Sequence, residues 1–188
     1  MLIFILIPLL IAKIKGYKVL SIFRSIDMYP FFFTCLCHIV FVISAWFGNH
    51  TFVKYSDALQ YFMILTLIFP ILRHKITYPA IFGAGLTVVG TFLNKIVINA
   101  NNGKMPVYPT LSKLIKFYKP GQLDGSIDGL HILLDKSSKL PYLADYIDIG
   151  TCIMSPGDLL IHAFTSIVIY YTVKSINTDI KHKERRQS

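Results

Sequence analysis

The chain has 188 residues, of which 54% are hydrophobic and 15% charged, and its mean hydropathy is +0.55. A soluble domain carries about 25% charged residues, so this composition argues against a soluble globular protein and against intrinsic disorder. The formal net charge of +9 would suggest a nucleic-acid ligand in a soluble chain, but here the apolar residues form long blocks and many cations lie at their ends. We therefore predict a single-domain membrane protein that is embedded in the lipid bilayer and binds no nucleic acid.

Five apolar blocks predict an all-α bundle of five transmembrane helices, which forms one membrane domain over residues 1–188. The helices are predicted at about residues 1–15, 29–47, 58–72, 76–98 and 157–174. The first block is short and contains Pro8, so it spans the bilayer only if Lys13 and Lys15 extend to the head groups. An interfacial helix is the alternative for this block. Its cations follow the apolar run, whereas those of a cleaved signal peptide precede it, which favours a retained helix.

The distribution of Lys and Arg predicts the orientation, because cytoplasmic connections of membrane proteins accumulate these residues. More than half of the 19 Lys and Arg follow the first block, separate the third block from the fourth, or lie in the C-terminal stretch from Lys174. The connections on the other side hold few or balanced charges. We therefore expect the N-terminus outside, the tail of residues 175–188 in the cytoplasm, and the segment of residues 99–156 outside the cell.

The extracytoplasmic segment, residues 99–156, is too long for a structureless loop. We expect Thr110 to cap an amphipathic helix over residues 111–118, lying on the outer membrane surface or over the bundle. Two Asp-Gly turns follow, and then a second apolar run over residues 131–134. The segment is thus predicted to be partly helical.

Part of this segment matches the spacing of a calcium-binding loop. The matching residues are Asp124, Ser126, Asp128, Gly129 and Asp135. However, Pro120-Gly121 interrupts the incoming helix, and an Asp stands where the closing bidentate Glu is usual. Ordinary turns explain the pattern, so the sequence predicts no metal site and no cofactor.

The start of the last helix has a clear local signal at Ser155-Pro156-Gly157-Asp158. Ser155 can accept a backbone N–H group, Pro156 fits the first helical position, and Asp158 can close a capping box. Capping alone would explain Asp158.

Polar residues near the outer ends of the helices form a candidate ligand-binding cluster. Asn94 and Lys95 lie near the end of the fourth predicted helix, and His162 lies one turn into the fifth, on the same face as Asp158. Ionisable residues within spans are functional candidates by default. The alternative is that Lys95 extends to the head groups while Asp158 caps its helix.

Several sequence runs resemble an uncharacterised family of small bacterial five-helix membrane proteins, which carries an LN..V...NGG(R/K)MP-like motif at the end of its fourth helix. The resembling runs are residues 93–107, 131–135, 139–147 and 155–158. Asn102 stands where the family more often has Gly, and Lys104 where it often has Arg. These two residues and His131 complete the candidate ligand-binding set. The resemblance implies the fold and a bacterial cell-membrane location, and it implies no established activity.

A second likeness is to lipoprotein signal peptidases, which place one catalytic Asp in a short extracytoplasmic motif and another at the start of their last helix. Asp145 and Asp158 are similar in type and order, and they are our candidate catalytic residues. Two nearby carboxylates that share a proton can activate water. The spacing between the two is short, however, and Met105-Pro106 stands in place of an element typical of those enzymes.

The leading functional hypothesis is a non-enzymatic subunit or accessory of a membrane assembly, with a membrane-protein partner or a second copy of the chain. The alternatives are a protein that binds a lipid or hydrophobic peptide at the outer polar cluster, and an aspartyl-dyad membrane hydrolase. A subunit of an assembly requires a helix face that the chain itself leaves uncovered. An aspartyl-dyad hydrolase requires two close carboxylates that open to a groove.

Overall fold

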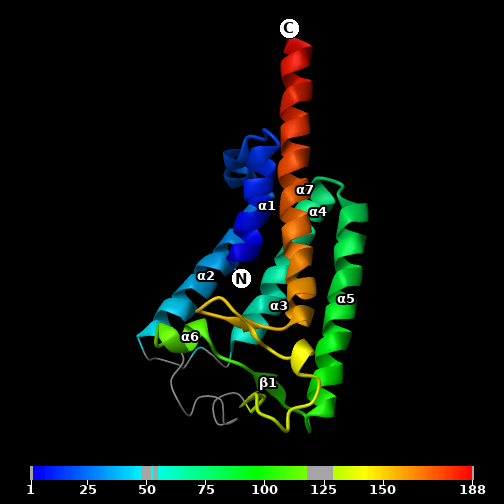
Figure 1. Ribbon diagram of the computed structural model, residues 1–188. Coiled ribbons are helices and arrows are strands. Elements are labelled where there is room, and N and C mark those ends of the chain that lie inside the picture. The colour runs from blue at the N-terminus through cyan, green and yellow to red at the C-terminus, as the bar shows by residue number, and fades with distance from the viewer. Residues whose placement is uncertain (1, 48–51, 53–54, 118–128, 188) are drawn as a thin grey trace. The chain divides into compact units, whose positions relative to one another are not determined.

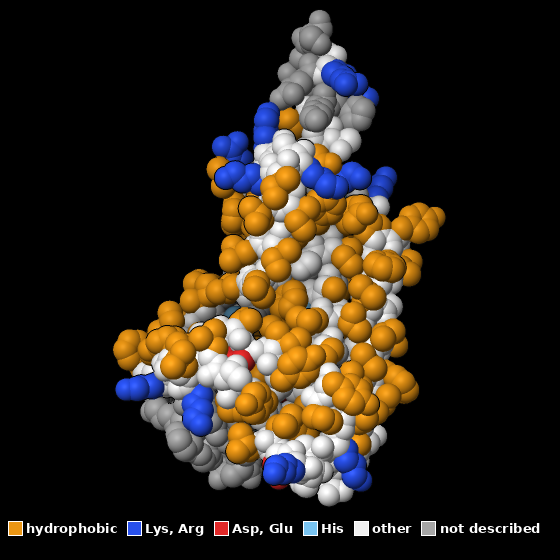
Figure 2. Space-filling model, viewed as in Figure 1, with side chains coloured by type: hydrophobic (Ala, Val, Ile, Leu, Met, Phe, Trp, Pro, Cys, Tyr) orange, Lys and Arg blue, Asp and Glu red, His pale blue; other side chains and the backbone are white. Residues whose placement is uncertain are grey.

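The structure is a computed structural model that describes residues 2–47, 52, 55–117 and 129–187 (Figure 1). It is mostly helical. Within these described ranges, three helices are long and apolar enough to cross a membrane, Ile26–Trp46, Thr77–Ala100 and Pro156–Ile180, and two shorter helices are apolar, Ile3–Ile14 and Ala58–Arg73. Hydrophobic side chains cover much of the surface in view (Figure 2). These features indicate a helical membrane protein.

The five apolar helices begin and end close to the predicted positions, with two differences described below. The α-helices are α1 Ile3–Ile14, α2 Tyr29–Trp46, α3 Ser56–Thr66, α4 Ile68–Arg73, α5 Thr77–Ala100, α6 Leu111–Leu114 and α7 Pro156–Gln187. Short 3₁₀ helices cover Val19–Arg24, Ile26–Met28 and Pro141–Leu143. The chain divides into two compact units, which are described separately. The first unit comprises residues 1–40, 57–85 and 162–188, and the second comprises residues 41–56 and 86–161.

The predicted third helix is interrupted at Leu67, so that α3 and α4 replace one continuous helix. Pro70 causes the break because it has no N–H group for the carbonyl of Thr66. The N–H group of Leu67 donates to the carbonyl of Ile64, three residues earlier, at 3.1 Å. The hydroxyl of Thr66 donates to the carbonyl of Met63 at 2.7 Å, so this carbonyl still has a donor.

The predicted last helix is also longer than expected, because α7 continues through the predicted tail to Gln187. No Gly or Pro follows Gly157 in the chain, and the tail is rich in Lys, Arg and other good helix formers. Nothing in the sequence therefore stops the helix at residue 174.

In the first unit, α7 lies between α1 and α5 (Figure 1). The core of this unit is apolar and includes Phe31, Met63, Leu67, Val168 and Ile169, each at most 1% exposed. Asn177 of α7 binds the segment after α1, because its side-chain oxygen accepts the N–H of Lys18 at 2.7 Å. The carboxylate of Asp27 lies 3.3 Å from Nε2 of His74, which joins the start of α2 to the turn after α4.

A proline in α1 explains one contact between α1 and α7. Pro8 has no N–H group, so the carbonyl of Phe4, four residues earlier, lacks its usual donor within the helix. The hydroxyl of Ser166 in α7 donates to this carbonyl at 2.7 Å. One turn earlier in α7, the ring of His162 stacks on the ring of Phe4 at 4.7 Å between centroids. Ser166 and His162 on one face of α7 therefore bind the start of α1.

The second unit contains short strands, so the all-α expectation needs correction for the segment between α5 and α7. β1 Met105–Val107 pairs in parallel with β2 His131–Leu133, and β3 Ile147–Asp148 pairs antiparallel with β4 Ile153–Met154. β2 is the second apolar run of the sequence. A small core of Val97, Met105 and Ala144 lies where the end of α5 meets β1. Strands of two or three residues leave too short a pattern to be recognised in the sequence.

The predicted amphipathic helix is only the four-residue α6, and its predicted cap is wrong. Thr110 makes no side-chain capping bond; instead, Oδ2 of Asp148 accepts the N–H groups of Thr110 at 2.7 Å and of Ser112 at 2.9 Å. Lys116, at φ 59°, lies outside helical geometry, so the helix does not continue through it. Tyr118 and the calcium-like residues Asp124, Ser126 and Asp128 lie outside the described residues.

We predict that Ser166→Ala lowers the free energy of unfolding by about 1 kcal/mol, because the carbonyl of Phe4 loses its donor. In a Pro8→Ala background, the introduced alanine supplies the missing N–H group, so the same substitution should cost less. The measurement is unfolding of the purified protein in detergent. Thr178→Ala is the control, since Thr178 bonds to the carbonyl of Lys174 four residues earlier in an unbroken helix. Equal effects of Ser166→Ala in both backgrounds would contradict this explanation.

Candidate functional site

The start of α7 is fixed by the predicted capping box, which the structure confirms. Ser155 Oγ accepts the N–H of Asp158 at 2.9 Å, and Asp158 Oδ2 accepts the N–H of Ser155 at 2.9 Å. Asn94 of α5 joins this box from the side. Its Nδ2 donates to Asp158 Oδ1 at 2.8 Å, and its Oδ1 accepts the hydroxyl of Ser155 at 2.8 Å. Both carboxylate oxygens of Asp158 are therefore engaged within the protein.

Two glycines allow α5 and α7 to approach closely enough for these bonds. A Cβ atom added to Gly90 would overlap the carbonyl oxygen of Gly157, and one added to Gly157 would overlap Oδ1 of Asn94. Glycine is required at both positions because nothing larger than a hydrogen atom fits between the backbones. Gly90 lies one turn before Asn94, so the close contact and the polar network are adjacent on α5.

Asp145 lies beside the small parallel sheet and is only 4% exposed. Its N–H donates to the carbonyl of Pro106 at 3.0 Å, and its own carbonyl accepts the N–H of Tyr108 at 2.7 Å. The backbone of Asp145 therefore pairs in parallel with Val107 of β1. Its Oδ2 lies 3.6 Å from Nε2 of His131 in β2. Its Oδ1 is buried without a hydrogen-bond partner among the described residues.

The environment of Asp145 favours its neutral form. Burial raises the pKa of Asp145 to about 8, and the negative charge of Asp158 adds to this increase. At neutral pH the side chain of Asp145 is therefore mostly protonated and can donate a hydrogen bond. A protonated carboxyl near a carboxylate is the electrostatic arrangement of an acid–base pair. Here, however, one member is buried and the other is engaged by Asn94 and Ser155.

The other candidate ligand-binding residues are distributed over different parts of the structure. Lys95 is exposed on α5, and His162 packs against Phe4 in the first unit. Asn102 has φ 56° in the turn that ends α5, where the N–H of Gly103 bonds back to the carbonyl of Ile98. The ammonium group of Lys104 donates to the carbonyl of Gly129. Their proposed roles in binding stay predictions. Packing against Phe4 gives His162 a structural role, and the bond to Gly129 gives Lys104 one.

Two polar residues that organise the second unit were not among the candidates from the sequence. Asn101 holds the backbone of Lys139 through both side-chain atoms, with Nδ2 donating to its carbonyl at 2.9 Å and Oδ1 accepting its N–H at 2.8 Å. Asp148 caps α6. Partial burial acts to raise the pKa of Asp148, but hydrogen bonds from Ser112, Gly150 and Thr110 outweigh it and lower the pKa. Each residue bonds to a segment nearly forty positions away, which local patterns do not reveal.

The long apolar helices and the short strand-containing segment between α5 and α7 define a helical membrane protein, and a polar network joins α5 to the start of α7. A family model matches residues 4–170, and the chain belongs to this family, a family of unknown function (DUF5317). This confirms the resemblance to an uncharacterised family. The comparisons with curated proteins and with solved structures found no match.

The raised pKa of Asp145 predicts that stability falls as pH rises. Between the ordinary pKa of 3.8 and about 8, the folded protein binds one proton more than the unfolded chain. The stability of the folded form is therefore greatest at the acid end of this range and is lost towards pH 8, by an amount on the order of a few kcal/mol. Asp145→Asn should remove this dependence and stabilise the protein at pH 8.

Unfolding of the purified protein in detergent at pH 5 and pH 8 measures this effect. Asp135→Asn is the matched control: hydrogen bonds from Ser137 and Ser138 lower the pKa of Asp135, so it stays ionised throughout this range. A pH dependence that persists unchanged in Asp145→Asn would show that another group causes it.

Proposed function

We propose that this protein is a five-span integral membrane protein that acts without catalysis, as a subunit or accessory of a larger membrane assembly. Its N-terminus and the segment of residues 99–156 lie outside the cytoplasm, and the C-terminal end of α7 lies inside. The partner is another membrane protein or a second copy of the chain, and it docks on α5.

The relative directions of the helices support five spans. Phe4 lies beside His162, and Lys18 lies beside Asn177, so α1 runs parallel to the part of α7 in the first unit. The first and fifth spans of a five-span protein must be parallel in this way. In the second unit, Gly90 of α5 lies against Ile161 of α7, and Asn94, one turn later in α5, meets Asp158, which is about one turn earlier in α7. α5 and α7 are therefore antiparallel, as consecutive spans must be.

The observation that carries the docking proposal is the exposed face of α5. Only 17% of its most apolar stretch is buried, against 33% for α7. Gly85 lies on this face, and a Cβ added there would meet nothing within 4 Å. The neighbouring residues on the surface of this one continuous helix are large and at least half exposed: Ile81, Phe82, Val88 and Val89.

Gly85 thus forms a notch in a bulky apolar surface. Gly in a helix costs about 1 kcal/mol relative to Ala, and here no packing among the described residues requires it. A notch between large side chains accepts a side chain from another helix, and small residues are typical of such contacts in lipid. This is the uncovered helix face that a subunit of an assembly requires.

An aspartyl-dyad hydrolase is the second candidate, and it is supported by the effect of Asp158 on the pKa of Asp145. Against it, Asp145 is 4% exposed, and both oxygens of Asp158 accept hydrogen bonds from Asn94 and Ser155. Water would have to displace these bonds to reach the pair. The structural role of Asp158 therefore fits the geometry better.

Gly85→Leu tests the docking proposal, because it fills the notch without a clash in the chain itself. We expect its thermal stability in detergent to equal or exceed that of the natural protein, while the amount of partner recovered from native membranes falls at least about tenfold. That loss corresponds to about 1.4 kcal/mol of docking energy. A differently tagged second copy of the chain detects self-association.

Val40→Leu is the control, because it adds bulk to an exposed position on α2. Recovery of the same partner with Gly85→Leu as with the natural protein, or recovery of no partner with the natural protein, would contradict the proposal.

A further inference from the structure

A groove between α1 and α7 has two chemically different ends. It has a volume of about 410 Å³, within the range of about 300–1,000 Å³ that is usual for ligand sites. Ile7, Pro8 and Ile11 of α1 and Ile167 of α7 form its apolar part. All of its lining residues belong to the first unit.

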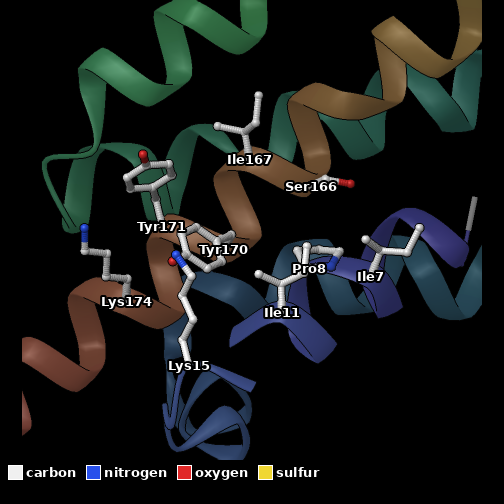
Figure 3. A pocket seen from close by; sticks show the side chains of 9 residues that line it. All are labelled: Ile7, Pro8, Ile11, Lys15, Ser166, Ile167, Tyr170, Tyr171 and Lys174. Atoms are coloured by element: carbon white, nitrogen blue, oxygen red, sulfur yellow. The ribbon is translucent and has the colours of Figure 1, made fainter. Parts of the chain in front are cut away.

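Two lysines and two tyrosines lie together at the other end of the groove (Figure 3). Nζ of Lys15, from the end of α1, lies 5.6 Å from the ring centroid of Tyr170. Nζ of Lys174 lies 5.5 Å from the ring centroid of Tyr171. Both distances fit cation–π contacts, which hold an ammonium group near a ring without neutralising its charge.

The charge of this end is not compensated by the part of the protein that the structure describes. Among the described residues, neither Lys15 nor Lys174 forms an ion pair with an acidic side chain. The groove therefore combines two positive charges, two phenol groups and an apolar channel beside them. Figure 2 shows Lys and Arg side chains gathered next to the hydrophobic surface towards the C-terminal end of α7.

We propose that this groove binds one anionic phospholipid. The phosphate of the head group lies between Lys15 and Lys174, the hydroxyl of Tyr170 beside Lys15 can donate to its oxygens (Figure 3), and an acyl chain follows Ile11 and Ile7 along α1. Amphipathic ligands with a negative head and an apolar tail match both ends of the groove, whereas a free phosphate uses only one. The proposed orientation places the site in the inner leaflet, but the groove itself does not depend on the docking face of α5.

The full-length protein, reconstituted in nanodiscs of phosphatidylcholine with a varied fraction of phosphatidylglycerol, tests the site. Native mass spectrometry after release from the nanodiscs counts the lipids that remain bound. We expect one retained phosphatidylglycerol per chain. The double substitution Lys15→Gln with Lys174→Gln should reduce its retention at least about tenfold, and Ile11→Trp, which fills the apolar end, should reduce it with both lysines present.

The matched control is Lys13→Gln with Lys75→Gln, which removes the same charge from two exposed lysines that do not line this groove. Its retention should stay within about twofold of the natural protein, and glycerol 3-phosphate should not displace the lipid. An equal loss of phosphatidylglycerol retention in the two double variants would overturn the proposal, because it would show that the net positive charge attracts the lipid without a specific site. Equal retention of phosphatidylcholine and phosphatidylglycerol, or full displacement by glycerol 3-phosphate, would also overturn it.

Discussion

Hydrocarbon offers no water to a polar backbone group, and this constraint explains several side-chain hydrogen bonds to the backbone of the helices. At two interruptions and at one helix start, a side chain supplies a missing partner. Ser166 donates to the carbonyl that Pro8 leaves without a donor, and the hydroxyl of Thr66 donates to the carbonyl of Met63 beside the break before α4. At the start of α7, Ser155 and Asp158 satisfy each other's backbone N–H groups.

The same constraint gives a structural meaning to residues that look functional in the sequence. Asp158 and His162 lie on one face of α7, and each has a neighbour that accounts for its position: Asn94 for the carboxylate and Phe4 for the imidazole ring. A polar residue in an apolar helix can thus serve the contact between two helices. Asp145 differs because its buried Oδ1 has no hydrogen-bond partner among the described residues, and its protonation compensates for this burial.

The helices and the capping box could be predicted from the sequence because their causes are local. Apolar blocks of sufficient length define the helices, and the Ser-Pro-Gly-Asp run contains every group that the box at the start of α7 uses. The extension of α7 to Gln187 can also be predicted from the sequence, because no Gly or Pro follows Gly157. The break at Leu67 follows from Pro70.

The rest depends on contacts between distant segments. Three of these contacts join residues that are 26 to 38 positions apart. They are the pairing of β1 with β2, the cap that Asp148 provides to α6, and the hydrogen bonds between Asn101 and Lys139. For the same reason, the sequence identified Asn94 and Asp158 as candidates but did not reveal Gly90, whose missing side chain lets their helices meet. Spacing alone did not show which small residues face a neighbour and which, like Gly85, face outwards.

The orientation of the chain is the most direct test of the whole interpretation, because it decides which solvent the strand-containing segment and the end of α7 meet. Single cysteines at the exposed positions Lys136→Cys and Asp179→Cys, in a chain whose Cys35, Cys37 and Cys152 are replaced by Ser, can be labelled with a membrane-impermeant maleimide. The proposed orientation predicts labelling of Lys136→Cys in intact cells and of Asp179→Cys only after permeabilisation. The reverse pattern would contradict it.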